Sequence, residues 1–314
     1  MTDVVVIGEP LVEFAGDSAL ADGAPLRLGF SGDALNTAAA AAAAGAQTAL
    51  LARVAADELG DALVSFAAGL GIDVSHVARV PAPQGAYLVR ADATGDRQFC
   101  YLRRGSAGST LQPADLSLLD QARPRAVLSS GITWAISDSA AATVRLAARM
   151  TADRGGLFVY DPNYRPRLTS AQAAAAALRA LMPMTSLVTP SCPVETVALL
   201  GTDDPRTAAD TLRSLGATAA VITQGAQGVS VHDGTFREYP AVPAPLVVDQ
   251  TGAGDCFTGT MTARLSLGDP LDRAVEAALA AAAAAVSATG ALGHLRGEPP
   301  REIARATAER PLIC

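Results

Sequence analysis

The sequence predicts an α/β fold built on a doubly wound, mostly parallel sheet with helices on both faces. Short apolar segments rich in β-branched residues alternate with longer helical segments, and glycines close several of the helices. Strands separated by helices at this spacing form parallel sheets that are buried on both faces. In such sheets, ligands bind at the carboxyl ends of the strands. The expected strands are residues 4–8, 48–54, 126–130, 157–160, 187–189 and 219–223.

Helices are expected between these strands and in the last third of the chain. One of them contains the alanine run 280–285, which could be mistaken for a membrane span. Asp272, Arg273 and Glu276 lie in its first turns, and alanine is the strongest helix former, so a buried helix of a soluble protein is favoured. The expected helices are residues 34–44, 59–70, 139–153, 193–200, 205–215, 256–267 and 271–288.

Two pairs of segments interrupt this alternation. Residues 11–14 with 26–30, and 87–90 with 98–103, alternate polar and apolar side chains and have no crossover helix between them. They predict antiparallel strands in a small sheet that covers a cleft. We therefore expect a single domain over residues 1–314, with a discontinuous β-sheet lid formed by about 11–31 and 85–105.

Composition excludes several classes of function. The net charge is −7 and the isoelectric point is about 5.0, and no basic run is present, so neither nucleic acid nor a membrane is an expected partner. The N-terminal residues lack the pattern of a signal peptide, which predicts a cytoplasmic protein. The four cysteines are scattered and only three histidines are present, so neither a disulfide framework nor a zinc cluster is expected.

Every basic residue is arginine, because the sequence contains no lysine. A Walker A loop and the ATP site of protein kinases each need a lysine, and so does Schiff-base chemistry. These three mechanisms are excluded.

The segment 249–255, Asp-Gln-Thr-Gly-Ala-Gly-Asp, follows the β-rich residues 246–248 and precedes an apolar helical pattern. Its glycines let the backbone approach a ligand, and successive amides at a helix N-terminus bind anions. Asp255 could be an ordinary helix cap. A carboxylate beside such a turn is also placed to take a proton from a hydroxyl while the amides hold a phosphoryl group.

Several motifs in order along nearly the whole chain resemble the ribokinase-like (pfkB) sugar kinases. They are residues 8–10, 32–36, 161–165, 223–228 and 252–255. The resemblance implies the ribokinase-like form of this fold with its β-sheet lid, ATP and Mg²⁺ as cofactors, and a small sugar or sugar acid as substrate. It also implies a homodimer or higher homo-oligomer that pairs through the lid.

The resemblance implies roles for the C-terminal motifs. Asp255 is the general base, and Gly252, Ala253 and Gly254 supply the amides of the anion hole. Glu195 is expected to hold Mg²⁺ through water. The family has Asn-x-x-Glu at this point, whereas this chain has Ser191 in place of the Asn and one residue more between it and the glutamate. A glutamate in the first turn of a helix is also favourable because of the helix dipole alone. ATP is expected at Ser191, Thr223, Gly225, Gly228 and Gly254, and a monovalent cation at Asp249 and Thr251, where use of K⁺ is left open.

Within this family, the chain most resembles the 2-keto-3-deoxygluconate kinases. The resemblance rests on residues 30–36, 101–107, 130–133 and 161–168 and on the Pro-Ser-x-x-x-Glu spacing of 190–195. Arginine can bind the carboxylate of an acid sugar in bidentate fashion. The expected substrate-binding residues are Gly32, Asp33, Asn36, Tyr87, Tyr101, Arg103 and Arg165.

Alternatives stay open at this stage. The two tyrosines could instead hold the lid or a dimer partner, and Arg165 could pair with a surface acid. The alternative functions are a fructokinase, ribokinase or nucleoside kinase of the same family, or a regulator that binds sugar or nucleotide without catalysis.

Overall fold

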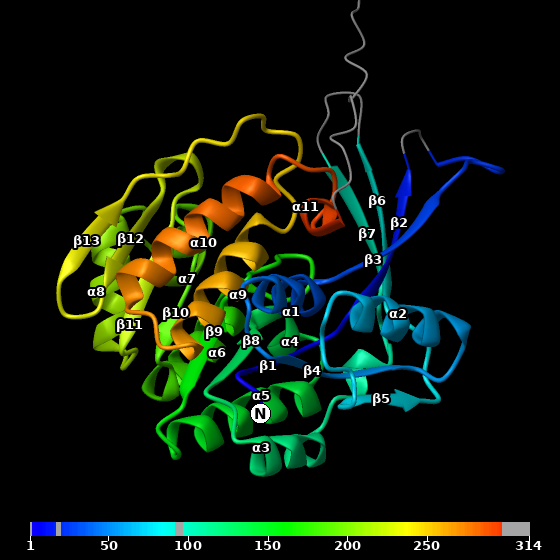
Figure 1. Cartoon of the computed structure of the whole chain (residues 1–314), viewed down its shortest axis with the longest axis horizontal. Helices are drawn as coiled ribbons and strands as arrows, with labels where there is room; N and C mark the ends of the chain where they lie inside the picture. The colour runs from blue at the N-terminus through cyan, green and yellow to red at the C-terminus, as the bar shows by residue number, and fades with distance from the viewer. Residues whose placement is uncertain (1, 17–19, 92–96, 297–314) are drawn as a thin grey trace, which may run out of the picture.

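The computed structural model describes residues 2–16, 20–91 and 97–296. A nine-stranded sheet flanked by helices forms the body, and a separate four-stranded sheet stands beside it (Figure 1). The predicted fold class is confirmed. Residues 1, 17–19, 92–96 and 297–314 of the expected domain lie outside the described residues.

The large sheet has the order β13-β12-β11-β10-β9-β8-β1-β4-β5. Its strands from β11 to β5 run parallel, and β12 and β13 continue it as an antiparallel hairpin. Strand β1 lies between β4 and β8, so the chain winds outward in both directions from the centre; ligands bind at such a switch point. The strands are β1 (Val4–Ile7), β4 (Thr48–Ala55), β5 (Val77–Val80), β8 (Ala126–Ser130), β9 (Leu157–Asp161), β10 (Leu187–Val188), β11 (Ala219–Thr223), β12 (Val229–His232) and β13 (Phe236–Tyr239).

Helices cover both faces of this sheet. One face packs against α1 (Asp33–Ala43), α2 (Glu58–Gly69), α9 (Ala253–Ser266) and α10 (Leu271–Ala285). The other packs against α3 (Ser117–Ala122), α5 (Asp138–Ala152), α6 (Ala171–Leu181), α7 (Val194–Leu200) and α8 (Pro205–Ser214). Short helices complete the chain: α4 (Gly131–Ala135), α11 (Gly293–Arg296), and the 3₁₀ helices η1 (Gly108–Thr110), η2 (Pro113–Leu116), η3 (Met182–Met184) and η4 (Gly225–Gln227).

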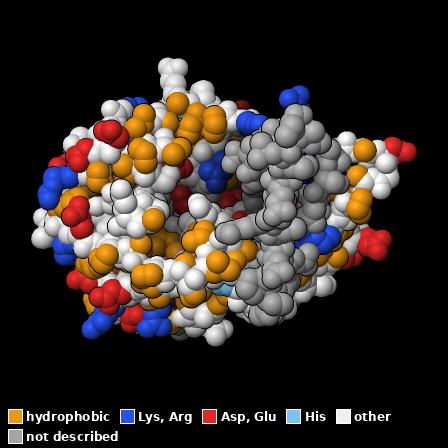
Figure 2. Space-filling model, turned by 90° about the horizontal axis from the view of Figure 1, so that it is seen from above, with side chains coloured by type: hydrophobic (Ala, Val, Ile, Leu, Met, Phe, Trp, Pro, Cys, Tyr) orange, Lys and Arg blue, Asp and Glu red, His pale blue; other side chains and the backbone are white. Residues whose placement is uncertain are grey.

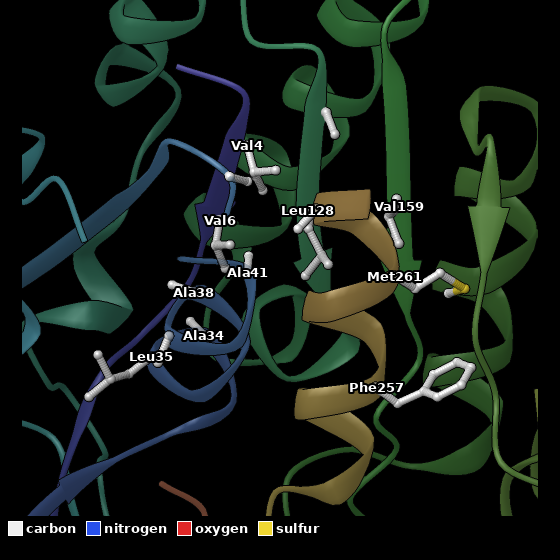
Figure 3. Packing of buried hydrophobic residues seen from close by; sticks show 14 of the residues in the cluster. Val4, Val6, Ala34, Leu35, Ala38, Ala41, Leu128, Val159, Phe257 and Met261 are labelled. Carbon is white, nitrogen blue, oxygen red and sulfur yellow. The ribbon is translucent and has the colours of Figure 1, made fainter. Parts of the chain in front are cut away.

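Small residues bring α1 and α9 close together on the same face of the sheet. In Figure 3, α1 lies beside Val6 and α9 lies beside Leu128 and Val159, and these side chains belong to one buried cluster. A Cβ atom on Gly259 would lie 2.3 Å from the carbonyl oxygen of Thr37, so only glycine lets the two backbones approach this closely. This contact sets the first turn of α9 beside the first turn of α1.

The small sheet has the order β3-β2-β6-β7. Its strands are β2 (Leu11–Gly16), β3 (Arg27–Ser31), β6 (Ala86–Ala91) and β7 (Arg97–Leu102), and all four lie within the segments expected to form the lid. The hairpin partners are antiparallel, whereas β2 and β6 pair in parallel and join the two hairpins. We call this sheet the lid.

Some elements differ from the sequence-based expectation. The sequence patterns do not predict strands β5, β12 and β13, helices α3, α4, α6 and α11, or the 3₁₀ helices. The β-rich segment 246–248 does not form a strand, because the amides of Val248 and Asp249 donate to the carbonyl of Val286 at the end of α10 instead of to a neighbouring strand. Within the described residues, helices that combine the length and apolar character needed to cross a bilayer are absent.

Candidate active site

A group of polar side chains gathers where β1, β8 and β9 end and α1 and α9 begin. Viewed from above, the middle of this face is hollowed, and acidic and basic side chains lie inside the hollow (Figure 2). Asp255 is at the centre of the group, in the first turn of α9.

The Asp255 carboxylate is held by two amide side chains. Asn36 Nδ2 donates to one carboxylate oxygen over 2.8 Å, and Asn163 Nδ2 donates to the other over 3.5 Å. The N-cap of α9 is Gly252, and no side chain caps this helix. Asp255 is therefore not a helix cap, and its carboxylate is held outside the helix by residues from α1 and from the loop after β9.

The surroundings of Asp255 favour its protonated form. Burial, followed by the negative charge of Asp33, raises the pKa of the carboxyl to about 6. Hydrogen bonds from Asn36 and Asn163 and the positive charge of Arg165 oppose this rise. A carboxylate with a pKa this close to neutral pH suits proton abstraction from an alcohol better than an ordinary aspartate.

The turn before Asp255 has the backbone that an anion site requires. Gly252 has a φ of 77°, and a Cβ atom there would lie 2.5 Å from the Cβ of Ala291, so glycine is needed at this position. The first backbone bond that closes a turn of α9 runs from the Cys256 amide to the Gly252 carbonyl, so the Gly254 amide precedes the helical ladder. The Ala253 amide instead donates to the Gln250 carbonyl over 3.4 Å.

A second cluster of carboxyl groups adjoins Asp255. Burial and the negative charges of Glu195 and Asp255 raise the pKa of Asp161, at the end of β9, well above its usual range. Glu195 accepts hydrogen bonds from the amides of Ser191, over 2.7 Å, and Tyr164. A divalent cation would relieve the repulsion among these carboxylates, so the residues present fit Mg²⁺. Within the described residues, no group of three or more His, Cys, Asp or Glu side chains is placed to hold a metal ion, so the Mg²⁺ site at Glu195 stays a prediction.

Four of the residues expected to bind ATP lie beyond or at the ends of β10 and β11, whereas Gly254 lies in the first turn of α9. Ser191 forms an isolated parallel bridge with Thr223. Gly225 and Gly228 both have positive φ, and a Cβ atom on Gly228 would lie 2.0 Å from the Tyr239 carbonyl oxygen. These glycines are therefore required by the turn itself, and nucleotide binding there stays a prediction.

Asp249 and Thr251, the expected cation ligands, belong to a structured loop. One Asp249 oxygen accepts from the Thr251 amide over 2.9 Å, and the other accepts from the Gly290 amide over 2.7 Å. These bonds tie the loop before α9 to the loop after α10. A monovalent-cation site there stays a prediction.

The expected sugar-binding turn lies at the start of α1. Gly32 is the N-cap of this helix, and a Cβ atom there would lie 2.9 Å from the Glu9 carbonyl oxygen. Asp33 accepts a hydrogen bond from the hydroxyl of Ser130, at the end of β8. Since Asp33 and Asn36 both act on Asp255, the structure brings the sugar turn and the predicted base together.

The lid tyrosines pack against each other. The rings of Tyr87 and Tyr101 are 6.3 Å apart, and both contact the ring of Phe99. The Tyr87 hydroxyl donates to Glu13 on the neighbouring strand, and Tyr87 is buried. These contacts are compatible with both interpretations: the two tyrosines can hold the lid together, and they can bind the sugar.

The two expected arginines have different surroundings. Arg103, immediately after β7, forms an ion pair with Glu9, and 9% of its side chain is exposed. Arg165 is exposed, and its positive charge lowers the pKa of both Asp161 and Asp255, so it lies near the carboxylate cluster.

Sequence reasoning assigned no role to Asn163, Asp161, Ser130 or Glu9, although all four stand in motifs that it singled out. Asn163 has a φ of 39°, a conformation in which asparagine is enriched over other residues. The position of this Asn, two residues beyond the end of a buried strand, could have marked it as a candidate site residue. Its contact with Asp255 could not be predicted from the sequence, because it depends on the fold.

Comparison with known proteins agrees with this geometry. The family model for the pfkB family of carbohydrate kinases matches residues 1–295. The chain belongs to this family. The sequence-based predictions of the family and of an ATP-dependent sugar kinase are thereby confirmed.

Relatives in this family carry several substrate names. The 2-dehydro-3-deoxygluconokinase of Thermoproteus tenax is 36% identical over 294 residues, covering 89% of this chain and 87% of the relative. Fructokinase-1 of Oryza sativa subsp. japonica is 29% identical over 313 residues, covering 94% of this chain and 95% of the relative. Among solved structures, the PfkB protein from Polaromonas sp. JS666 superimposes with a TM-score of 0.84 and 25% identity, covering 94% of this chain and 99% of the other.

Proposed function

We propose that this carbohydrate kinase transfers the γ-phosphoryl group of ATP to a hydroxymethyl group of 2-keto-3-deoxygluconate, also called 2-dehydro-3-deoxygluconate. One observation carries the proposal: the Asp255 carboxylate is held by Asn36 and Asn163 in the first turn of α9, beside amides that precede the helical ladder. A binding protein without catalysis would not need a carboxylate of raised pKa at this point.

In the proposed reaction, Asp255 takes the proton of the sugar hydroxyl as its oxygen attacks the γ-phosphorus. A new P–O bond forms to the sugar, and the bond between the γ-phosphorus and the bridging oxygen of ADP breaks. The Gly254 amide and the positive end of α9 face the negative charge of the transferring group. Arg165 supplies further positive charge beside the carboxylate cluster.

ATP and Mg²⁺ are the proposed cofactors. A putative ribokinase II from E. coli, of the same fold with a TM-score of 0.83, is described in complex with ATP and Mg²⁺. Mg²⁺ would neutralise phosphate charge near Asp161 and Glu195, a task that no lysine can perform in this chain. Because the reaction consumes ATP, we place the enzyme in the cytoplasm.

The proposed substrate rests on two arginines and on the relatives. Arg165 offers a guanidinium group near Asp255, and Arg103 offers one beside Glu9, as an acid sugar requires. A neutral ketose such as fructose is the second candidate, because Glu9 pairs with Arg103 and reduces the net positive charge available to a carboxylate.

Two further features belong to this proposal. K⁺ would bind by Asp249 and Thr251, close to the start of α9. Two chains would pair through their lids, where Leu28 and Leu102 expose 53% and 57% of their surfaces. Large exposed apolar side chains on one small sheet are typical of an interface.

The test is a coupled assay of ADP formation with 2-keto-3-deoxygluconate, fructose and ribose. We expect turnover with the acid sugar, its loss in Asp255→Asn by at least about two orders of magnitude, and weaker binding of the acid sugar in Arg103→Ala. Fructose turnover that persists in Arg103→Ala would favour the neutral-sugar candidate. Wild-type protein that binds ATP but phosphorylates no sugar in the panel would refute the proposal.

A further inference from the structure

Glu9 lies two residues beyond the end of β1, the strand at the switch point of the large sheet. It is only 1% exposed. Its side chain has no solvent-exposed surface at all. A carboxylate buried in this way is costly unless the fold supplies partners. Burial raises the pKa of Glu9, and Arg103 and Ser106 oppose that rise.

The surroundings of Glu9 are built around its carboxylate. Arg103 donates from Nη2 to one oxygen, and the Ser106 hydroxyl donates to the other. A Cβ atom on Gly85 would lie 2.4 Å from Oε1 of Glu9, and one on Gly108 would lie 2.3 Å from its Cγ. Glycines at both positions therefore make the space that the Glu9 side chain occupies.

This ion pair joins the sheet to the lid. Glu9 follows β1 at the switch point, whereas Arg103 follows β7 of the lid, 94 residues away in sequence. A buried ion pair by itself is weak evidence for added stability, because desolvation offsets much of the attraction. Its definite effect is geometric: it fixes one end of the Arg103 guanidinium.

The rest of that guanidinium is not fully used. Arg103 Nε is buried, and it has no hydrogen-bond partner in the part of the chain that the structure describes. Nine-tenths of the side chain is buried, so this donor has no contact with bulk solvent. A buried N–H group without an acceptor is unfavourable, and an oxygen of a bound ligand would satisfy it.

We infer that Glu9 is a positioning residue for substrate: it holds Arg103 Nη2 so that the Nε–H group is presented to a carboxylate or carbonyl oxygen of the sugar. This inference rests on the proposed function and adds a residue to its binding site. Because Glu9 cancels the charge of Arg103, recognition depends on where the donor points more than on net positive charge. The negative charge of Asp33 also faces Glu9 and adds to the need for an accurately placed cation.

The test compares Glu9→Gln, Arg103→Ala and the double variant by steady-state kinetics with the sugar that wild-type enzyme phosphorylates best. Glutamine carries no charge and has one acceptor oxygen in place of two, so at most a hydrogen bond from Arg103 Nη2 to a neutral oxygen remains and the guanidinium is held less firmly. Glu9→Gln is expected to raise KM for the sugar by about fivefold to tenfold, as when a neutral acceptor replaces a charged one in a hydrogen bond. Its kcat and its KM for ATP stay within about twofold.

The double variant separates positioning from general damage. If Glu9 acts through Arg103, adding Glu9→Gln to Arg103→Ala leaves the sugar KM unchanged. A similar increase in KM in both backgrounds would overturn the inference, and so would a sugar KM in Glu9→Gln that is unchanged or lower. Wild-type enzyme without sugar kinase activity would instead count against the proposed function.

Two further variants protect the test against misfolding. Asp115→Asn removes the charge from a second ion pair, between Arg53 and Asp115, and is expected to lower the melting temperature without changing the sugar KM. If Glu9→Gln does not fold, Ser106→Ala removes one donor to Glu9 and is expected to raise the sugar KM by about twofold to fivefold, only while Arg103 is present. No increase in Ser106→Ala would overturn the inference.

Discussion

Asn36 donates from Nδ2 to a carboxylate oxygen of Asp255 over 2.8 Å, although 219 residues separate the two in sequence. The Ser31 hydroxyl donates to Oδ1 of the same asparagine over 3.2 Å, which fixes the amide so that its NH₂ group faces Asp255. Asn36 belongs to the turn proposed to bind the sugar. One side chain therefore links substrate binding to the orientation of the proposed base.

This link predicts a specific pH dependence. Since the pKa of Asp255 is raised to about 6, kcat/KM of the wild-type enzyme should fall as the pH drops through about 6, where the base becomes protonated. The Asn36 hydrogen bond lowers this pKa, so in Asn36→Ala the acid limb should move to higher pH. We also expect kcat to fall by about tenfold or more, because the carboxylate loses its orientation. Initial rates across the pH range measure both effects.

Asn163→Ala is the matched comparison for Asn36→Ala. Its bond to Asp255 is longer, at 3.5 Å, so the acid limb should move in the same direction but by less. An acid limb that moves to lower pH in Asn36→Ala would contradict the assigned role of this asparagine.

The turn at Gly252 carries a second prediction. Alanine there must adopt a φ near 77° and also place its Cβ 2.5 Å from the Cβ of Ala291. We expect Gly252→Ala to lower the free energy of unfolding by about 1 to 3 kcal/mol. We also expect a loss of kcat, since the amides at the start of α9 are displaced. Urea unfolding and steady-state kinetics measure the two effects.

Gly268→Ala separates strain from collision in this prediction. Gly268 has a φ of 99°, but a Cβ atom there would meet nothing within 4 Å. It lies beyond the C-terminal end of α9, at the opposite end of the helix from Gly252. It should lose stability through backbone strain alone and keep full activity. If Gly252→Ala is no more damaging than Gly268→Ala, the close packing against Ala291 has no functional consequence.

Sequence patterns predicted the central strands well because these strands are buried on both faces. The expected bounds 126–130 and 219–223 are those of β8 and β11. The hairpin of β12 and β13 was missed, since its strands mix polar and apolar residues and only four residues of each pair. The segment 246–248 has strand-like residues, but its amides bond to the end of α10, and nothing local in the sequence indicates that partner.

The site was predictable to the extent that its chemistry is local. The glycine turn and Asp255 lie within four residues, so a short motif states both the anion site and the base. The partners of Glu9 and Asn163 lie 94 and 92 residues away, and only the folded sheet and lid bring them together. A motif can therefore contain such residues without indicating what they do.

The third prediction concerns how much the ionised Asp255 carboxylate lowers the free energy of unfolding. The pKa of Asp255 is raised from 3.8 to about 6 in the folded protein, so between these values the folded state binds a proton more tightly than the unfolded state. The free energy of unfolding contributed by this group is therefore highest at low pH and falls as the pH rises through this window. Asparagine has no charge to bury, so Asp255→Asn should be more stable than wild type at pH 7.5, by about 2 to 3 kcal/mol. Urea unfolding at pH 7.5 and near pH 4 measures this difference.

The gain in Asp255→Asn should disappear near pH 4, where both proteins carry a neutral side chain at this position. Asp73→Asn is a control of opposite sign: the pKa of Asp73 is lowered by its hydrogen bonds with Ser75, so this variant should be less stable than wild type at neutral pH. Its deficit should shrink as the pH falls and Asp73 becomes protonated. A stability gain in Asp255→Asn that is independent of pH would mean that packing, and not the buried charge, limits stability at this site. Because the same charge is what lets Asp255 accept a proton, its cost to folding and its use in phosphoryl transfer have one physical origin.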